Sequence, residues 1–190
     1  MDTSRRVHRM TIAAVLCAIG MIIPIISPVK IPLGMLGSFT LASHVAIFIA
    51  IFISPTTAVS VSIATAFGFL LTPIGTPEVM ARALSHIIFA IIGALIIKKN
   101  PNILKSLWKV LIFSLLIACL HAVCEMLVVI PFFFGNPAKM EKGFVTSILM
   151  LVGAVTVIHS LVDFFLALLI WKPLSKMKSL TDVPSKPKTA

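Results

Sequence analysis

The sequence has 190 residues, of which 59% are hydrophobic and only 12% are charged. A soluble domain of this length carries about 25% charged residues, so the composition excludes a soluble enzyme or binding domain and indicates a protein surrounded mainly by lipid. The formal net charge is +10, but the basic residues flank apolar segments and form no basic face, so we expect no nucleic-acid partner.

Six apolar segments are candidates for membrane-spanning helices. They lie at about 9–26, 38–54, 56–72, 79–97, 106–130 and 144–171, and a spanning helix needs about 20 residues. The second and third are short and meet at Pro55, which suits the first turn of a new helix, so five or six spans fit. We expect an all-α integral membrane protein with one membrane domain over residues 1–174, followed by a disordered cytoplasmic tail over 175–190.

The distribution of lysine and arginine predicts the orientation of these spans. With the N-terminus in the cytoplasm, twelve of these residues fall on the cytoplasmic side and four on the outer side. Positive residues accumulate on the cytoplasmic side of membrane proteins, so we expect both termini to be cytoplasmic. The outer loops at 27–37, 72–77 and 131–143 are rich in proline and glycine, which fits either a capped cavity open to the outside or simple tight turns.

Ionisable side chains inside the spans are the main functional signal, because such groups are costly in lipid and face a protein interior or a water-filled cavity. They occur in pairs four residues apart, which share a helix face: Thr40 and His44, Arg82 and His86, His121 and Glu125, and His159 and Asp163. A rise of 1.5 Å per residue puts Arg82 level with Glu125 in the outer half of the membrane. Asp163 falls nearer the cytoplasm, away from the others.

This convergence predicts a polar cavity for a small solute, in which Arg82 is the candidate anchor for an anionic group. The candidate lining residues are Phe39, Thr40, His44, Arg82, His86, His121, Glu125 and Asn136. An alternative is that Arg82 and Glu125 form a buried ion pair that only holds two helices in register. The roles of His159 and Asp163 stay open, and we assign no catalytic residue, metal ligand or cofactor.

Two other protein classes remain to be weighed. A stand-alone secondary transporter or channel typically contains internal repeats, and we find no convincing one. An intramembrane enzyme would need a nucleophile or a metal centre, and although four histidines lie within the spans, no H-x-x-x-H spacing occurs. No Walker A pattern is present, so energy for any uptake must come from partner subunits or an ion gradient.

Three segments carry a resemblance to a known family. The first span reads MTIAAVLCAIG over residues 10–20, with Ala14 and Ala18 in an A-x-x-x-A pattern, and the stretches 38–55 and 82–90 are similar in kind. They resemble the S components of energy-coupling-factor (ECF) vitamin transporters, in the niacin-like branch. The resemblance implies a six-helix bundle in a bacterial cell membrane that binds a small water-soluble vitamin and imports it with a membrane scaffold subunit and two ATPase subunits.

The resemblance also assigns roles to particular residues. Ala14 and Ala18 would pack on the scaffold subunit, since small residues let helices approach closely, and residues 27–37 would cover a pocket in the outer half. S components for nickel or cobalt begin with Met-His, whereas Asp2 follows Met1 here. Because the chain has no tyrosine, a small ring or flexible acid is expected instead of a large planar ligand. Nicotinate is the favoured substrate and pantothenate the alternative, because Arg82 suits either carboxylate.

Overall fold

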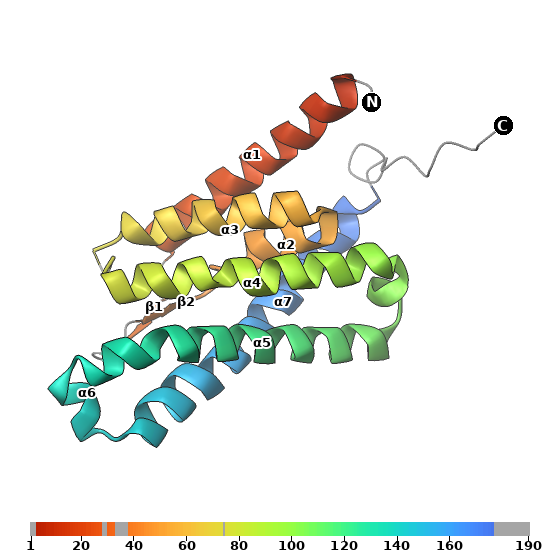
Figure 1. Ribbon diagram of the computed structural model, residues 1–190. Helices are drawn as coiled ribbons and strands as arrows, with labels where there is room; N and C mark the ends of the chain where they lie inside the picture. Colours follow the sequence, from red (N-terminus) through yellow and green to blue (C-terminus); the bar gives the residue numbers. More distant parts are fainter. Residues whose placement is uncertain (1–2, 28–29, 33–37, 74, 177–190) are drawn as a thin grey trace.

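The computed structural model of the protein describes residues 3–27, 30–32, 38–73 and 75–176. The described chain is almost entirely helical (Figure 1). Its elements are α1 (Thr3–Ile26), β1 (Lys30–Pro32), β2 (Ser38–Thr40), α2 (Val45–Ile53), α3 (Pro55–Leu70), α4 (Pro77–Lys99), η2 (Pro101–Lys105), α5 (Leu107–Phe134), α6 (Pro137–Glu141), η3 (Val145–Ala154) and α7 (Val155–Leu174). The two strands form a short antiparallel pair with Ile31 opposite Phe39, and the expected all-α architecture is otherwise confirmed.

Within the described residues, four helices are long and apolar enough to cross a membrane: Val7–Ile26, Pro77–Lys99, Leu107–Phe134 and Val145–Leu174. Helix α3 is also apolar but has 16 residues. The prediction of one continuous helix over 38–54 is wrong, because this segment begins with β2 and a turn and becomes helical only at Val45. At 1.5 Å per residue, the nine residues of α2 extend about 14 Å, less than half of the bilayer core.

Helices α3 and α4 begin with side-chain caps. Ser54 precedes α3 and accepts a hydrogen bond from the backbone nitrogen of Thr57 at 3.2 Å, with Pro55 at the first helical position as predicted. Thr76 caps α4 in the same way, accepting from the nitrogen of Val79 at 3.3 Å. Such caps satisfy backbone donors that a helix leaves unpaired, so the α2–α3 turn is defined by its own sequence.

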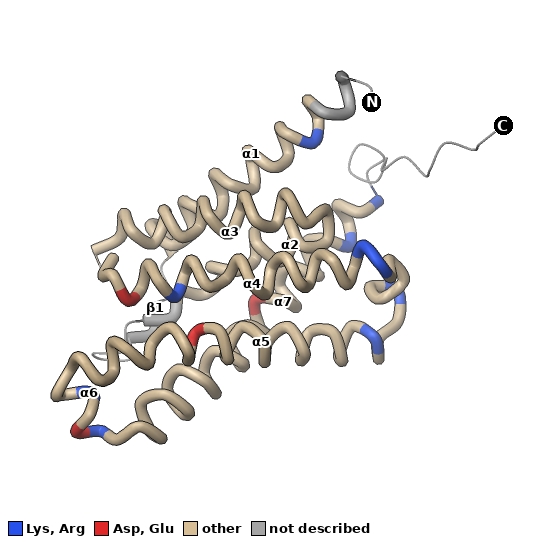
Figure 2. Tube along the Cα trace, in the orientation of Figure 1, with Lys and Arg blue, Asp and Glu red and all other residues tan. Residues whose placement is uncertain are grey.

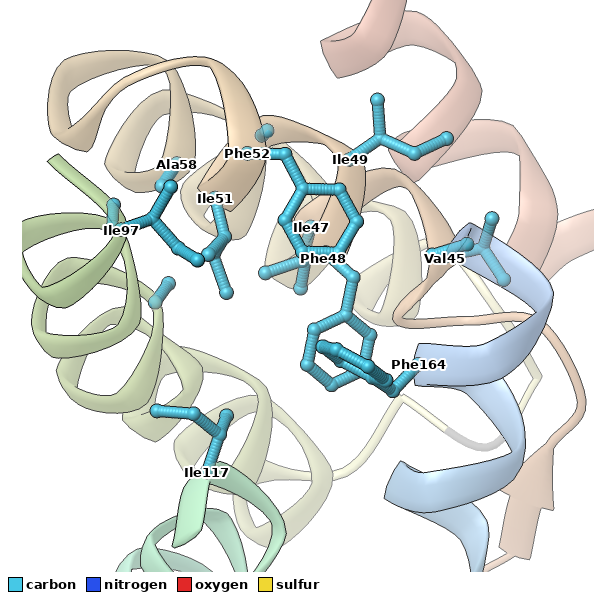
Figure 3. Close-up of a cluster of buried hydrophobic side chains, with 14 of the residues drawn as sticks. Val45, Ile47, Phe48, Ile49, Ile51, Phe52, Ala58, Ile97, Ile117 and Phe164 are labelled. Carbon is cyan, nitrogen blue, oxygen red and sulfur yellow. The ribbon is translucent and has the colours of Figure 1, made fainter. Parts of the chain in front are cut away.

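Helix α2 is the centre of the apolar core. Every residue from Val45 to Phe52 is buried, and side chains from α4, α5 and α7 close around it (Figure 3). The rings of Phe48 and Phe52 pack edge-on against Phe164 of α7, with centroids 5.3 and 5.7 Å away. Because α2 begins directly after a polar turn, this core forms the floor beneath the polar site described below.

Helix α1 lies along α3 with its C-terminal half and extends away from the bundle with its N-terminal half (Figure 1). The contact depends on two glycines: a Cβ atom at Gly68 would lie 2.3 Å from the carbonyl oxygen of Met21, and one at Gly20 would lie 2.5 Å from Thr65 Oγ1. Any larger side chain would separate the two helices. The residues of the A-x-x-x-A pattern take no part in this contact and are exposed on α1.

The two ends of the bundle differ in charge (Figure 2). Lysines close α4, η2 and α7, all at the end where α1 begins. The opposite end carries the α3–α4 connection and α6, where Lys139 forms an ion pair with Glu78. These lysines are therefore grouped at one end, as the sequence predicts, and the assignment of that end to the cytoplasm stays a prediction.

Two predicted segments fall largely outside the described residues. Of the expected covering loop at 27–37, the structure describes residue 27 and the backbone of β1. Of the expected tail at 175–190, it describes the first two residues. Both expectations therefore stay predictions.

Candidate functional site

A polar cavity lies beside the N-terminal end of α2. Its empty space is about 330 Å³ when the open mouth is included, but only about 30 Å³ of it admits the centre of a water-sized sphere, so the cavity is narrow. β2, the following turn, α3, α4, α5 and α7 supply its walls through Thr40, Ser43, His44, Phe69, Val79, Arg82, Ala83, His86, Glu125 and His159. Segments far apart in the sequence thus meet at one small site.

The carboxylate of Glu125 is the centre of the first polar group. Arg82 donates hydrogen bonds to its Oε2 from Nη2 at 2.7 Å and from Nε at 3.3 Å, and Thr156 donates to the same oxygen at 2.8 Å. The Nε2 atoms of His86 and His121 lie 3.2 and 3.3 Å from Oε1. All five residues are buried, so the predicted Arg82–Glu125 pair exists and is embedded in a wider network.

Asp163 is the centre of the second polar group, and the expectation that it lies away from the others is wrong. Its Oδ1 accepts a hydrogen bond from the nitrogen of Ala42 at 2.8 Å, and its Oδ2 accepts one from the nitrogen of His44 at 3.0 Å. The Nδ1 of His44 lies 3.1 Å from Oδ2. The turn between β2 and α2 brings these groups against α7, and Ala42 adopts a left-handed backbone conformation with φ +67°.

Histidine side chains connect the two carboxylates. His44 lies in the middle, with its ring centroid 4.6 Å from that of His86, 4.7 Å from that of His121 and 4.9 Å from that of His159. The Nε2 atoms of His44 and His86 are 3.4 Å apart. The cluster therefore runs without interruption from Asp163 on α7, through His44 and His86, to Glu125 on α5.

The C-terminal helical segment begins with an irregular helix before it reaches the site. Its first part, η3, is a π-helix over ten residues and continues as α7; π-helical turns are rare and frequent at functional sites. η3 packs closely on α5, since a Cβ atom at Gly153 would lie 2.7 Å from the sulfur of Met126. The regular helix resumes just before Thr156, the residue that bonds to Glu125.

Five of the eight predicted lining residues line the cavity: Thr40, His44, Arg82, His86 and Glu125. His121 belongs to the same network through Glu125. Asn136 does not join it, because its side chain caps α6 by accepting hydrogen bonds from the nitrogens of Ala138 and Lys139. The backbone of Phe39 lies in β2, and its side chain lies outside the described residues.

Some lining residues were not predicted, although helical spacing along α4 indicates two of them. Val79 and Ala83 occupy the same helical face as Arg82 and His86, at spacings of three, four and seven residues. That pattern marks one face of a helix. Nothing in the sequence indicated Phe69 of the lining or Thr156, which donates to Glu125, because their positions depend on how α3 and the π-helical segment pack against α4 and α5.

The cluster combines anion-binding and cation-binding chemistry. Arg82 offers a fixed guanidinium at the cavity wall, and Thr40 offers a buried hydroxyl that has no hydrogen-bond partner among the described residues. Two sets of side chains also hold donor atoms within 4.8 Å of one another, a spacing that can accommodate a metal ion: His44, His86 and His121, and His44, His159 and Asp163.

Comparisons with known proteins identify the family. No family model and no solved structure matches the chain. The niacin transporter NiaX of Lactococcus lactis subsp. cremoris (strain MG1363) is 37% identical over 171 residues, which cover 90% of this chain and 76% of the relative. The chain belongs to this niacin transporter family. The match confirms the resemblance to the niacin-like branch of the S components.

Membership of the niacin transporter family agrees with the fold. A transporter relative and four long apolar helices identify a multi-pass membrane protein. The relative is a transporter, which is consistent with the protein class that the sequence favoured.

The contacts of Asp163 predict a contrast between two buried positions on α7. Asp163→Ala removes the acceptor for the 42–44 turn and should strongly lower the melting temperature in detergent, since breaking a buried charged contact costs roughly 3–5 kcal/mol. Ser160 is equally buried, but its hydroxyl has no partner among the described residues. Ser160→Ala should therefore leave the melting temperature unchanged or raise it. Equal losses in the two variants would contradict the anchoring role of Asp163.

Proposed function

We propose that this protein is the substrate-binding subunit of a niacin uptake system and that it binds nicotinate in the polar cavity. The observation that carries the proposal is the 37% identity to a niacin transporter over 90% of the chain. The lining of the site suits this ligand, since it combines polar groups with an apolar wall, and the narrow cavity must widen to admit the ring. Nicotinate itself is a single aromatic ring with one carboxylate.

Arg82 is the proposed anchor for the carboxylate of nicotinate. Glu125 accepts hydrogen bonds from Nε and Nη2 of Arg82. Glu125 therefore orients the guanidinium at the cavity wall. The apolar side chains of Phe69, Val79 and Ala83 line the same cavity and provide a surface for the ring.

Pantothenate is the second candidate, because it also carries a carboxylate that Arg82 can bind. It is larger and flexible, so its binding would require more space and a greater loss of conformational entropy. The narrow cavity favours the compact ring. A competition experiment between the two vitamins discriminates them directly.

Substitution of Arg82 tests the proposed anchor. Arg82→Lys keeps the positive charge but loses the bidentate fork, and Arg82→Gln loses both, so nicotinate affinity should fall in both variants and further in Arg82→Gln. Hydrogen bonds to charged groups contribute about 1.5–3 kcal/mol, so we expect a loss of roughly 10- to 100-fold. The measurement is equilibrium binding to protein purified in detergent and monodisperse by size-exclusion chromatography.

Lys142→Gln is the matched control, because Lys142 is exposed and lies outside the cavity. Its affinity for nicotinate should equal that of the wild type. Equal affinity of the wild type for nicotinamide and nicotinate would mean that Arg82 is structural and that Glu125 is its true partner. Displacement of nicotinate by equimolar pantothenate would favour the second candidate.

We infer that uptake requires a membrane scaffold subunit and two ATPase subunits, as the family resemblance implies. The chain has no Walker A sequence of its own. Helix α1 offers the most surface for a partner. Only 17% of the residues in its apolar stretch are buried, compared with 39–50% in the other three long helices. Ala14 and Ala18 lie on its exposed side and would allow another helix to approach closely.

Tryptophan substitutions test this interface. Ala14→Trp or Ala18→Trp should abolish nicotinate uptake in cells because the bulky ring blocks close helix packing, while nicotinate binding in detergent should stay within about twofold of the wild type. Leu115→Trp is the control, since Leu115 is exposed in the middle of α5, and it should change neither quantity. Loss of binding together with uptake would assign α1 to the pocket or core instead.

We propose six membrane crossings, the second of which combines β2, the following turn and α2. Non-helical backbone is tolerated at membrane depth only where it is buried in protein or lines a cavity. That condition fits the residues of this segment that line the cavity, Thr40, Ser43 and His44. The basic residues at the end where α1 begins favour a cytoplasmic location for that end and for both termini.

Cysteine labelling tests the orientation. In a cysteine-free background, Lys142→Cys should react with an impermeant maleimide added to intact cells, whereas Lys105→Cys should react only after the cells are opened. Both lysines are exposed at opposite ends of the bundle, while Lys139 is buried and paired with Glu78 and is a poor site for the label. The reverse labelling pattern would refute the orientation.

A further inference from the structure

We infer that the histidine cluster is also a binding site for a divalent transition-metal ion of the zinc class. The site consists of four side chains: His44, His86, His121 and Glu125. They come from the β2–α2 turn, α4 and α5, and all are buried. This inference does not depend on niacin being the substrate, because it rests on the donor atoms alone.

The spacing of the donor atoms is the first argument. The Nε2 atom of His86 lies 3.4 Å from that of His44 and 3.2 Å from Oε1 of Glu125, and the Nε2 atom of His121 lies 3.3 Å from the same oxygen. Zinc bonds to nitrogen and oxygen of about 2.0–2.1 Å in a tetrahedral site give ligand–ligand edges of about 3.3–3.4 Å. Three of the six edges therefore already have the length that a tetrahedral zinc site requires.

The remaining edges indicate how the site would close around an ion. The ring nitrogens of the three histidines lie within 4.8 Å of one another, so His44 and His121 would move toward the ion as it binds. Three neutral imidazoles and one carboxylate suit zinc and its transition-metal neighbours, whereas calcium and magnesium prefer oxygen ligands.

The surroundings of two of the donors, His44 and Glu125, are the second argument. The second ring N–H of a metal-binding histidine usually donates a hydrogen bond to a carboxylate or a carbonyl group, which fixes the tautomer. Nδ1 of His44 lies 3.1 Å from Asp163 Oδ2, which leaves Nε2 of His44 as the lone-pair donor toward the cluster. The second oxygen of Glu125 is held in turn by Arg82 and Thr156, so Oε1 is the oxygen directed at the proposed ion.

Titration of the full-length protein with Co²⁺ and Zn²⁺ tests the inference. The protein is purified in detergent, stripped with a chelator and titrated with Co²⁺, whose four-coordinate complexes absorb strongly in visible light. We expect saturable absorption at one Co²⁺ per chain, and its loss when Zn²⁺ is added. Absence of saturable absorption together with absence of Zn²⁺ binding by calorimetry would overturn the inference, whether or not nicotinate binds.

Three variants test the ligand set. His121→Gln removes one donor and should weaken Zn²⁺ binding by more than the roughly 10- to 100-fold that loss of an outer-shell partner costs, and Asp163→Asn should weaken it by that outer-shell amount. His8→Gln alters an exposed histidine of α1 and should bind Zn²⁺ as the wild type does. His86→Gln replaces His121→Gln if the latter does not fold. Equal Zn²⁺ affinity in the donor variant and His8→Gln would refute the assigned ligands.

Nicotinate binding is measured separately on the stripped and the Zn²⁺-loaded protein. Binding of nicotinate without metal binding would reject the metal site and leave the proposed function intact. Binding of metal without binding of nicotinate would support the metal site and reject the proposal that the protein binds nicotinate. The two proposals can therefore fail independently.

Discussion

The burial of the Glu125 carboxylate is the constraint on which the rest of the site depends. A charged group inside a membrane protein is tolerated only when other groups compensate it. Arg82 and His86 supply this compensation from α4, His121 from α5 itself and Thr156 from α7. Because these contacts require fixed distances, one carboxylate holds three helices in a single register and also fixes the guanidinium that faces the cavity.

The broken segment before α2 is the second organising feature. A continuous helix here would point its backbone polar groups along its own axis and leave nothing for Asp163 to bind. The turn instead exposes backbone nitrogens of Ala42 and His44, and Asp163 accepts from both. The left-handed conformation of Ala42 is unusual for a residue other than glycine, and such conformations persist where surrounding contacts enforce them. The structure thus replaces helical hydrogen bonds with contacts that orient His44.

Regular helices made much of the site predictable, and irregular segments limited that prediction. The levels of Arg82 and Glu125 follow from residue counts along α4 and α5, because a helix rises by a constant amount per residue. Thr40 and His44 were assigned to one helical face, but a strand and a turn hold them. Asp163 and Asn136 were misplaced for a similar reason: one contacts a turn, and the other caps a short helix after the irregular end of α5. Tertiary contacts decide these positions, and spacing does not encode them.

The enclosure of α2 has a consequence for the response of the protein to its bilayer. Changes in hydrocarbon thickness act on helices that face lipid, which tilt or shift to match the new thickness. Helix α2 is buried from Val45 to Phe52, so hydrophobic mismatch reaches it only through its neighbours. A change in lipid composition therefore acts only indirectly on the floor of the cavity. The long, lipid-facing helices α1, α5 and α7 can adapt to membranes of different thickness while the geometry beneath His44 stays the same.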